Sequence, residues 1–472
     1  GRAHVDWARS GAASADPQKG FPSAPAKRSA AWSPVAPGSS EPRPAGDEVE
    51  TCARCHSRRG QIAPAWHPGR PLTDSYDPIL LSHGQFEDDG QMKDEVFNDH
   101  SFKQSLMYRR GVVCSDCHDP HSGKTKAAGA AVCAQCHQPE RFAAEAHTGH
   151  APGPGAPDCI GCHMPSRTYM QVDRRHDHSF RVPRPDLTAQ IGTPNTCNAC
   201  HAARTARWAA DAVERWHGPV RKGHQTYATA FARSRAGDPE ARDMLQRLAN
   251  DPEVPALARA TAIDELTAWP AAASEDAARK ALADPDPVVR AIAVRRLEGQ
   301  PLARRRAALA LLTDDIRLVR IAAASLLADA AADMPDDAGR LAVEAALAEY
   351  ETALALDLDR PEIRANRAIL RLKQGRPAEA EQDYLAAMRL DPSAAAIAAQ
   401  LADLHRRSGN EAEAERVLRE VLRHAPRAAA ARHALGLSLV RQKRIGEALA
   451  ELESAATTEP GNARYALVYS AA

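Results

Sequence analysis

The sequence predicts a mainly α-helical protein in which a loop-rich N-terminal part precedes a helical solenoid. Residues 1–224 contain all ten cysteines together with many glycines and prolines, which favour loops and short helices. From about residue 225 the chain is rich in alanine, leucine and arginine, and its apolar residues follow a helical period. Beyond residue 327 a 34-residue repeat is present, which is typical of stacked pairs of antiparallel helices.

Every cysteine belongs to one of five Cys-x-x-Cys-His motifs. Two thiols three positions apart can each form a thioether with one vinyl group of the same porphyrin, and the next residue brings an imidazole to the iron. The motifs therefore predict five haems c in this chain. The predicted attachment residues are Cys52, Cys55, Cys114, Cys117, Cys133, Cys136, Cys159, Cys162, Cys197 and Cys200. The predicted proximal iron ligands are His56, His118, His137, His163 and His201.

Zinc binding and thiol redox chemistry are the rival interpretations of these motifs. A tetrahedral zinc site takes two cysteine pairs, or one pair and two histidines, so five pairs leave one pair unmatched. Thioredoxin-like pairs need no histidine after each second cysteine. Haem attachment is the preferred interpretation, and because it uses every cysteine, no structural disulfide is expected.

Histidines outside the motifs are concentrated near them. The sequence has 19 histidines, and of the 14 that lie outside the motifs only His405, His424 and His433 follow residue 224. This enrichment favours a second histidine on each iron. The preferred distal candidates are His121, His178, His147, His150 and His4, followed by His67, His83, His100, His176 and His217. His121 is preferred because the Asp-Pro turn before it would let it reach a neighbouring haem.

Other side chains near the motifs are weaker candidates. Met107 and Met164 are the competing sulfur ligands, although Met164 directly follows a proximal histidine and is expected to pack instead. Tyr108, Arg109 and Arg110 could pair with haem propionates or, at an open iron, bind an oxyanion; propionate pairing is the expected role.

The overall charge excludes several classes of partner. Lys+Arg and Asp+Glu both total 61, so net charge gives no reason to expect binding to nucleic acid or to a membrane surface. No apolar run approaches the roughly 20 residues of a transmembrane helix. Because haem c is attached outside the cytoplasm, a secretory signal upstream of Gly1 and a periplasmic or extracellular location in a bacterium are expected.

Composition and repeats divide the chain into four predicted segments. Residues 1–50 are predicted to be a flexible Pro/Ala/Ser-rich segment, and residues 51–224 a pentahaem domain. Residues 225–330 resemble HEAT repeats, since Arg259, Arg290 and Arg320 recur 31 and 30 residues apart after Asp-containing turns.

Residues 331–472 carry the tetratricopeptide period. Ala380, Ala414 and Ala448 are 34 residues apart, and prolines at the same period would end the second helix of each repeat. Small residues at these positions let two helices approach closely. The last repeat is expected to be truncated.

The motif-bearing part resembles a known family over residues 52–201. The matching strings are CARCHSRRGQI, DGQMKDEVF, SFKQSLMYRRGVVCSDCHDPHS, AVCAQCH, CIGCHMP, DHSFRVPRPD and GTPNTCNACH. They resemble multihaem cytochromes c related to ammonia-forming nitrite reductase and hydroxylamine oxidoreductase, in a bacterial subgroup with C-terminal tetratricopeptide repeats. The opening GRAHVDWA resembles the segment that follows a further haem motif in that subgroup, which implies about three more haems upstream. The Cys-x-x-Cys-Lys motif of the nitrite reductase does not occur in this chain.

These patterns predict an electron-transfer cytochrome with closely packed haems, whose helical repeats dock redox partner proteins or serve assembly. The alternative is a multihaem oxidoreductase that reduces or oxidises a small nitrogen or sulfur species at a five-coordinate haem. A third interpretation is a scaffold whose repeats recruit partner proteins while the haems serve assembly. The sequence does not decide whether the protein is an enzyme. It also does not decide whether the protein forms an oligomer or a filament.

Overall fold

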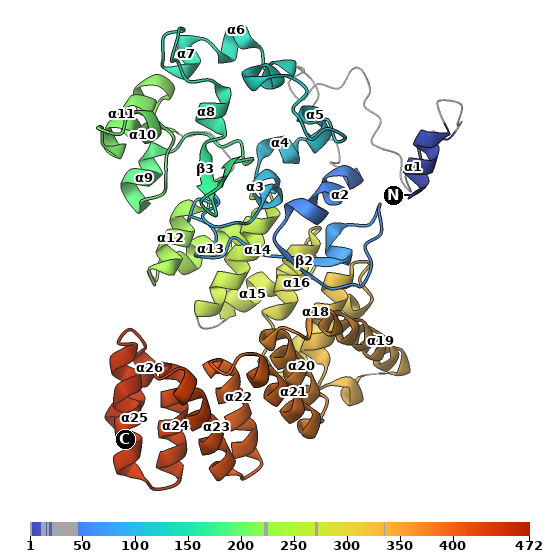
Figure 1. Ribbon diagram of the computed structural model, residues 1–472, viewed down its shortest axis with the longest axis vertical. Helices are drawn as coiled ribbons and strands as arrows, with labels where there is room; N and C mark the ends of the chain where they lie inside the picture. Colours follow the sequence, from blue (N-terminus) through green and yellow to red (C-terminus); the bar gives the residue numbers. More distant parts are fainter. Residues whose placement is uncertain are drawn as a thin grey trace. The chain divides into compact units, whose positions relative to one another are not determined.

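The computed structural model describes residues 2–10, 16, 18–20, 46–220, 225–269, 272–334 and 336–472 (Figure 1). Most of the segment predicted to be flexible, residues 1–50, lies outside the described residues. The chain forms two compact units, Gly1–Ala323 and Ala324–Ala472. The described residues are mainly helical, which confirms the predicted fold class.

Short helices joined by loops make up the motif-bearing part of the first unit. The α-helices are α1 (Arg2–Arg9), α2 (Gly46–His56), α3 (Asn98–Lys103), α4 (Leu106–Arg109), α5 (Cys114–Cys117), α6 (Pro139–Phe142), α7 (Glu145–Thr148), α8 (Cys159–His163), α9 (Pro185–Ile191), α10 (Cys197–Cys200) and α11 (Ala206–His217). Two 3₁₀ helices accompany them, η1 (Leu72–Asp74) and η2 (Gly129–Gln135). Four of the five motifs begin on α2, α5, α8 and α10, and the remaining motif begins on η2.

Two small antiparallel hairpins complete this part. Strand β1 (Arg59–Gln61) pairs with β2 (Tyr76–Pro78), and β3 (Ser166–Tyr169) pairs with β4 (Asp173–His176). The second hairpin leads directly from the motif on α8 to the segment that carries His178.

Protein side chains alone do not form a core around most of the motifs. None of the described residues 114–168 is buried. The buried apolar residues of this part lie elsewhere, for example Val49, Phe102 and Val113 in one cluster and Ala53 and Leu72 in another. A segment with so little buried apolar surface needs another source of packing.

A second set of helices belongs to the same unit. These are α12 (Ala228–Arg235), α13 (Ala241–Asn250), α14 (Ala256–Glu265), η3 (Leu266–Ala268), α15 (Ala272–Ala281), α16 (Pro287–Arg295), α17 (Leu302–Arg305) and η4 (Arg306–Thr313), followed by α18 (Arg317–Leu327), which crosses into the second unit. Arg259 binds Asp284 at 2.8 Å, and Arg290 binds Asp314 at 2.9 Å, so the arginine of one repeat pairs with the Asp-containing turn of the next. The HEAT assignment itself stays a prediction.

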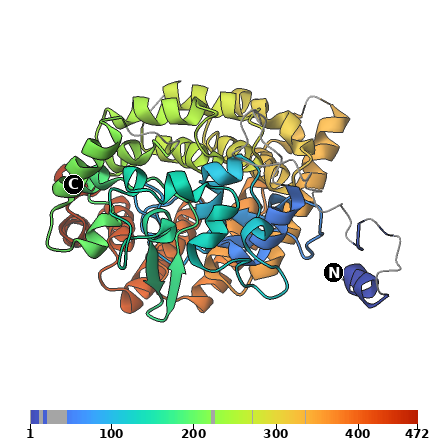
Figure 2. The same ribbon diagram turned by 90° about the horizontal axis from the view of Figure 1, so that it is seen from above.

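Residues 58–113 pack against these helices. Arg235 on α12 forms an ion pair with Asp88 at 2.6 Å, and Thr261 on α14 accepts a hydrogen bond from the backbone N–H of Leu81 at 3.1 Å. Figure 2 shows α12 to α16 as a layer along one side of the motif-bearing part. Residues 51–224 and 225–323 are therefore parts of one compact unit, while their separate standing as domains stays a prediction.

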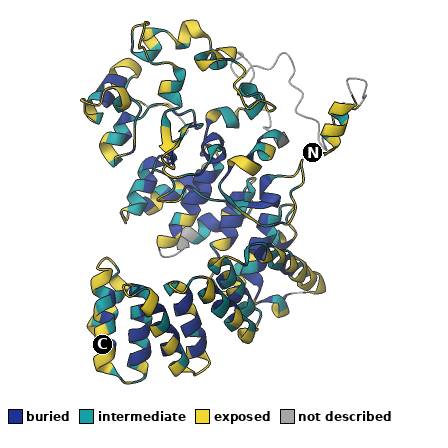
Figure 3. Ribbon diagram, in the orientation of Figure 1, coloured by how far each residue is buried: buried dark blue, intermediate teal, exposed yellow. Residues whose placement is uncertain are grey.

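The second unit is a stack of antiparallel helix pairs. Its elements are η5 (Ala331–Asp333), α19 (Asp337–Leu354), η6 (Ala355–Asp357), α20 (Pro361–Lys373), α21 (Pro377–Leu390), α22 (Ala395–Arg407), α23 (Glu411–His424), α24 (Ala429–Arg441), α25 (Ile445–Thr458) and α26 (Ala463–Ala471). Ala380, Ala414 and Ala448 are at most 1% exposed, as the repeat predicted. Figure 3 shows the buried residues on the facing sides of these helices. Across the described part of the chain, no helix is long and apolar enough to span a membrane.

Candidate haem-binding cavity

One continuous cavity in the first unit brings the five motifs together. Its volume is about 3090 Å³, and all ten cysteines and all five motif histidines line it. A pocket for a single small ligand usually measures about 300–1,000 Å³. The cavity is therefore large enough for several bulky groups rather than one.

Local backbone geometry explains how each motif presents its side chains. In three motifs the histidine N–H donates to the carbonyl of the first cysteine at 2.9 Å, as in His118 to Cys114. One helical turn thus places both thiols and the imidazole on the same side of the chain. Side-chain caps stabilise the start of two motif helices: at α8 Asp158 accepts from the N–H of Gly161 at 2.8 Å, and at α5 Asp116 accepts from the N–H of Val113 at 2.8 Å.

Thiols of successive motifs lie next to one another. The Cys52 thiol lies beside that of Cys114, and the Cys133 thiol lies beside that of Cys159. Burial, together with the neighbouring Cys159 thiol, raises the pKa of Cys133 to about 11. Porphyrins attached at such neighbouring cysteines would lie close together, which electron transfer between them requires.

Three motif histidines each face a second histidine across the cavity in nearly the same geometry. The pairs are His118 with His178 (ring centroids 6.4 Å apart, planes at 24°), His163 with His147 (6.0 Å, 22°) and His201 with His150 (6.1 Å, 24°). A metal lies about 2.0–2.1 Å from an imidazole nitrogen, which is itself ~1.1 Å from the ring centre, so two imidazoles on opposite sides of one metal have centroids roughly 6.2–6.4 Å apart. The three pairs fit iron held between two imidazoles.

One member of each pair has a fixed tautomer. In each case Nδ1 lies at hydrogen-bond distance from a backbone carbonyl: His163 from Arg181 (2.9 Å), His178 from His176 (2.9 Å) and His150 from Thr148 (2.7 Å). A carbonyl can only accept, so Nδ1 carries the proton and Nε2 keeps its lone pair. This is the arrangement that orients a metal-ligating histidine.

His4 and His121 form a fourth pair, although neither belongs to a motif. Their ring centroids are 6.3 Å apart with planes at 24°, and both line the cavity. His4 Nδ1 lies 2.7 Å from the carbonyl of Lys19. All five preferred distal candidates therefore line the cavity. Within the described residues, neither His56 nor His137 faces a second imidazole, and the ring nearest His137 is that of Phe142, edge-on at 5.3 Å.

The histidines ranked behind these five divide into two groups. His67, His83 and His100 do not line the cavity. His100 is buried, its Nε2 donates to the carbonyl of Ile79 at 3.1 Å, and burial lowers its pKa to about 4. His176 and His217 line the cavity, but neither ring is nearly parallel to that of a motif histidine. His217 instead lies edge-on to His147. Of these five lower-ranked candidates, only His176 and His217 line the cavity, and the ligand role of each stays a prediction.

The other weak candidates also separate. Met107, Met164 and Arg110 line the cavity. Arg109 instead forms an ion pair with Glu253 on the loop before α14. Burial raises the pKa of Tyr108 to about 12, so its hydroxyl stays protonated. Of the three side chains predicted to pair with propionates, only Arg110 lines the cavity.

Two features of the cavity were missed in the sequence. Lys103 is ion-paired with Glu50 at 3.2 Å and with Asp99 at 3.4 Å, and Asp99 lines the cavity with a pKa raised by burial to about 6. The Asp-x-x-x-Lys spacing, which puts both side chains on one helix face, was the available signal.

The other missed feature is aromatic. Trp208 lies 4.9 Å from His201, and Trp216 lies 5.8 Å from His150, so both indoles on α11 flank one histidine pair. The available signal was the spacing of Trp208 and Trp216, because two residues eight positions apart lie on the same side of an α-helix.

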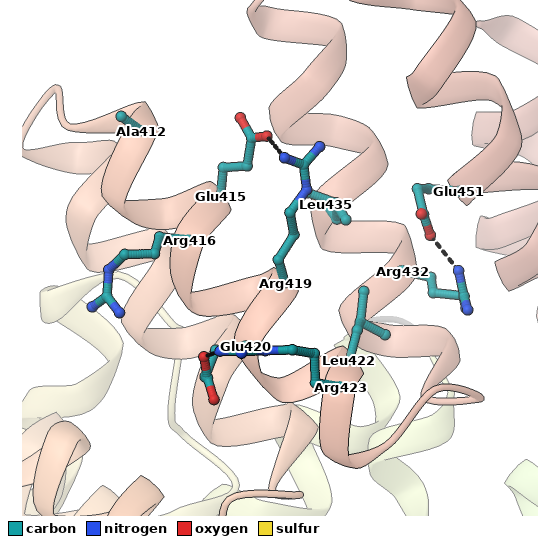
Figure 4. A pocket seen from close by; sticks show the side chains of 10 residues that line it. All are labelled: Ala412, Glu415, Arg416, Arg419, Glu420, Leu422, Arg423, Arg432, Leu435 and Glu451. Carbon is teal, nitrogen blue, oxygen red and sulfur yellow. Dashed lines mark hydrogen bonds and ion pairs between the residues drawn. The ribbon is translucent and has the colours of Figure 1, made fainter.

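A smaller surface pocket of about 620 Å³ lies on the second unit (Figure 4). Arginines and glutamates from α23, α24 and α25 line it, and these charges neutralise one another: Arg419 pairs with Glu415 at 2.6 Å, and Arg432 pairs with Glu451 at 2.6 Å. The pocket is an ion-pair surface rather than an anion site.

Comparison with known families agrees with both units. The family described as doubled CXXCH motif matches residues 108–142, and the tetratricopeptide repeat family matches residues 336–395 and 400–463. The first match indicates a multihaem c-type cytochrome, and the second confirms the tetratricopeptide repeats. Among curated proteins, none matches this sequence.

Solved structures give a weaker comparison. One similar chain is a monomeric mutant of IFIT1 with m7Gppp-AAAA, with 16% identity and a TM-score of 0.28, over 60% of this chain and 63% of that one. Another is a monomeric IFIT1 mutant with Gppp-AAAA, with 17% identity and a TM-score of 0.27, over 60% and 62% of the two chains. These scores are too low to support a shared fold over that length.

Proposed function

We propose that this chain is an electron-transfer cytochrome that carries five haems c in one cavity. The single observation that supports this best is that all ten motif cysteines and all five motif histidines line the same space of about 3090 Å³. In this proposal the cysteines named above hold the porphyrins, and His56, His118, His137, His163 and His201 are the proximal ligands. Haem iron supplies one-electron exchange between its ferric and ferrous states.

The distal ligands follow from the histidine pairs. His178, His147 and His150 are proposed as the sixth ligands of the irons on His118, His163 and His201 respectively. An iron with two imidazoles has no vacant position for a substrate, which suits an electron carrier. His4 and His121 face each other rather than a motif histidine, so they are proposed as iron ligands without assignment to one of the five motifs.

The helical repeats are proposed to bind the redox partner. Tetratricopeptide repeats commonly mediate protein–protein interactions through extended surfaces. A periplasmic or extracellular location is proposed for the same reason as above, because haem c is attached outside the cytoplasm.

The proposal is tested by counting haems. The intact mass of the protein should exceed that of the polypeptide by five haem masses, and acidified organic solvent should extract no colour. Fewer covalent haems, or zinc bound in a fixed ratio, would refute the proposal.

One observation favours the oxidoreductase as a second candidate. His56 and His137 face no second imidazole in the described residues, so an iron on either could keep a vacant position for a small nitrogen or sulfur species. Electron paramagnetic resonance of the oxidised protein separates the two functions. Five low-spin ferric haems support the electron carrier, whereas a high-spin haem that binds nitrite or cyanide supports the enzyme.

A further inference from the structure

We propose that Arg181 is a positioning residue that fixes the ligand histidines of two different haems through one short segment, Asp177–Arg181. The inference rests on the proposed function. Within this segment, His178 faces His118, and the carbonyl of Arg181 accepts the Nδ1 hydrogen of His163 at 2.9 Å. Five consecutive residues thus contact two motif sites that are 45 positions apart in sequence.

The guanidinium of Arg181 anchors both ends of the segment. Its Nε donates to Asp177 Oδ2 at 3.2 Å and to Ser179 Oγ at 3.0 Å, and its Nη1 donates to Asp89 Oδ2 at 3.3 Å. The side chains of Arg181, Asp89 and Asp177 are each at most 9% exposed. Buried charges of this kind are stable only when paired, so each holds the others in place.

Asp89 is itself held by its neighbours. Its carboxylate accepts from the side-chain amide of Gln91 at 2.8 Å and from the backbone N–H of Gln91 at 3.1 Å. At the start of the segment, the N–H of Asp177 donates to the carbonyl of Pro165 at 3.0 Å, two residues after the proximal ligand His163. The anchor therefore connects the residues 89–91 turn, the β3–β4 hairpin and the ligand segment.

The backbone of the segment needs such an anchor. Phe180 has φ of +46°, a left-handed conformation that is uncommon for a bulky residue and persists only where the surroundings fix it. Its ring packs edge-on against Phe102 and against His178. The contacts of Arg181 on one side and of Phe180 on the other hold this conformation.

The consequence for the haems follows from the imidazole hydrogen bond. Donation from Nδ1 to a carbonyl raises the basicity of a ligating histidine and fixes its ring plane. A more basic ligand stabilises ferric over ferrous iron, so a weaker hydrogen bond raises the midpoint potential. A tenfold change in the ratio of the ligand's affinities for ferric and ferrous iron shifts a one-electron midpoint potential by about 59 mV.

The test compares Arg181→Met with Arg184→Met in the full haem-loaded protein. Arg184 lies three residues away and pairs with Asp186 at 2.8 Å, and neither its side chain nor its carbonyl contacts a motif histidine. Two measurements are made: the five midpoint potentials by spectroelectrochemistry, and the haem methyl shifts by paramagnetic NMR, which report the ring planes of the axial histidines.

In Arg181→Met we expect five haems, a higher potential for one haem by about 59 mV for a tenfold effect, and altered methyl shifts for two haems. Arg181→Lys keeps the positive charge but loses the planar guanidinium that binds several acceptors at once. Its midpoint potential and methyl shifts should lie between those of Arg181→Met and the wild type. If Arg181→Met does not fold, Asp89→Asn replaces it with the same expectation and a smaller shift.

A haem-loaded variant with unchanged potentials and methyl shifts would overturn the inference, as would the same changes in Arg184→Met. Either result leaves the proposed function intact. A wild-type protein without covalent haem would instead refute the proposed function.

Discussion

Removal of one distal histidine should open one iron and leave the other four unchanged. His150 is the best choice, because the rings next to it are those of His201 and Trp216. An indole offers only an N–H donor and cannot replace an imidazole as a ligand. His147 is a poorer choice because His217 lies 6.1 Å from it and could take its place.

The size of the effect follows from the pairing. His150→Ala removes the imidazole that faces His201 at 6.1 Å, so one of five haems should change from low-spin to high-spin. The vacated space is that of one imidazole, which accommodates carbon monoxide. The reduced variant should therefore bind one carbon monoxide per chain, and the reduced wild type should bind none. His150→Met should keep the iron low-spin and raise its potential, because methionine ligation favours the ferrous state.

The assay is electron paramagnetic resonance of the oxidised protein, together with carbon monoxide titration of the reduced protein. His176→Ala is the matched control, because His176 lines the same cavity without facing a motif histidine. The ligand assignment is wrong if His150→Ala stays fully low-spin, or if His176→Ala gives the same high-spin signal.

Three further predictions concern stability. Gly436→Ala in α24 should destabilise the second unit by about 1–3 kcal/mol, because a Cβ there would lie 2.6 Å from Leu452 Cγ. Gly446→Ala in α25 has open space and should stabilise the unit by about 1 kcal/mol. Thermal unfolding followed by circular dichroism compares the two variants. Asp99→Asn should reduce the pH dependence of stability. Burial raises the pKa of Asp99 from 3.8 to about 6, so its contribution to stability is present below pH 4 and is lost as the pH rises through 6. Urea unfolding from pH 4 to 7 should therefore show a free energy of unfolding that falls more steeply with pH in the wild type than in the variant. Tyr227→Phe should destabilise the first unit by about 1 kcal/mol, because it removes the buried hydrogen bond to Gln104, and an unchanged urea midpoint would show that this bond contributes nothing.

Local signals in the sequence were sufficient for the tetratricopeptide repeats, and the haem attachment sites, which stay a prediction, rest on a local signal too. The Cys-x-x-Cys-His spacing is set within one helical turn, so its meaning does not depend on the rest of the fold. The 34-residue period likewise identified Ala380, Ala414 and Ala448 as contact positions, because each repeat contacts mainly its neighbours.

The pairing of histidines could not be read from the sequence, since it depends on contacts between distant segments. His178 was a good candidate by its position near a motif, but its proximity to His118, 60 residues earlier, is a property of the tertiary fold. The same holds for Arg181, whose partner Asp89 is 92 residues away. His100, by contrast, was a candidate by composition only, and its hydrogen bond to Ile79 shows that it belongs to the packing of the first unit.

The distribution of buried residues separates the first unit into a part that is stable by its own packing and a part that needs the haems. Residues 58–113 contain buried apolar side chains such as Phe86, and they are held to α12 and α14 by the ion pair of Arg235 with Asp88 and by the hydrogen bond from Leu81 N–H to Thr261. Residues 114–168 carry three complete motifs, yet none of these residues is buried by protein alone. Ordering a residue opposes folding by roughly 1–2 kcal/mol of backbone entropy, which this segment cannot offset without further apolar surface. Porphyrins attached in the shared cavity would supply that surface, so under the proposed function the haems would form the core of this segment as well as the path for electrons.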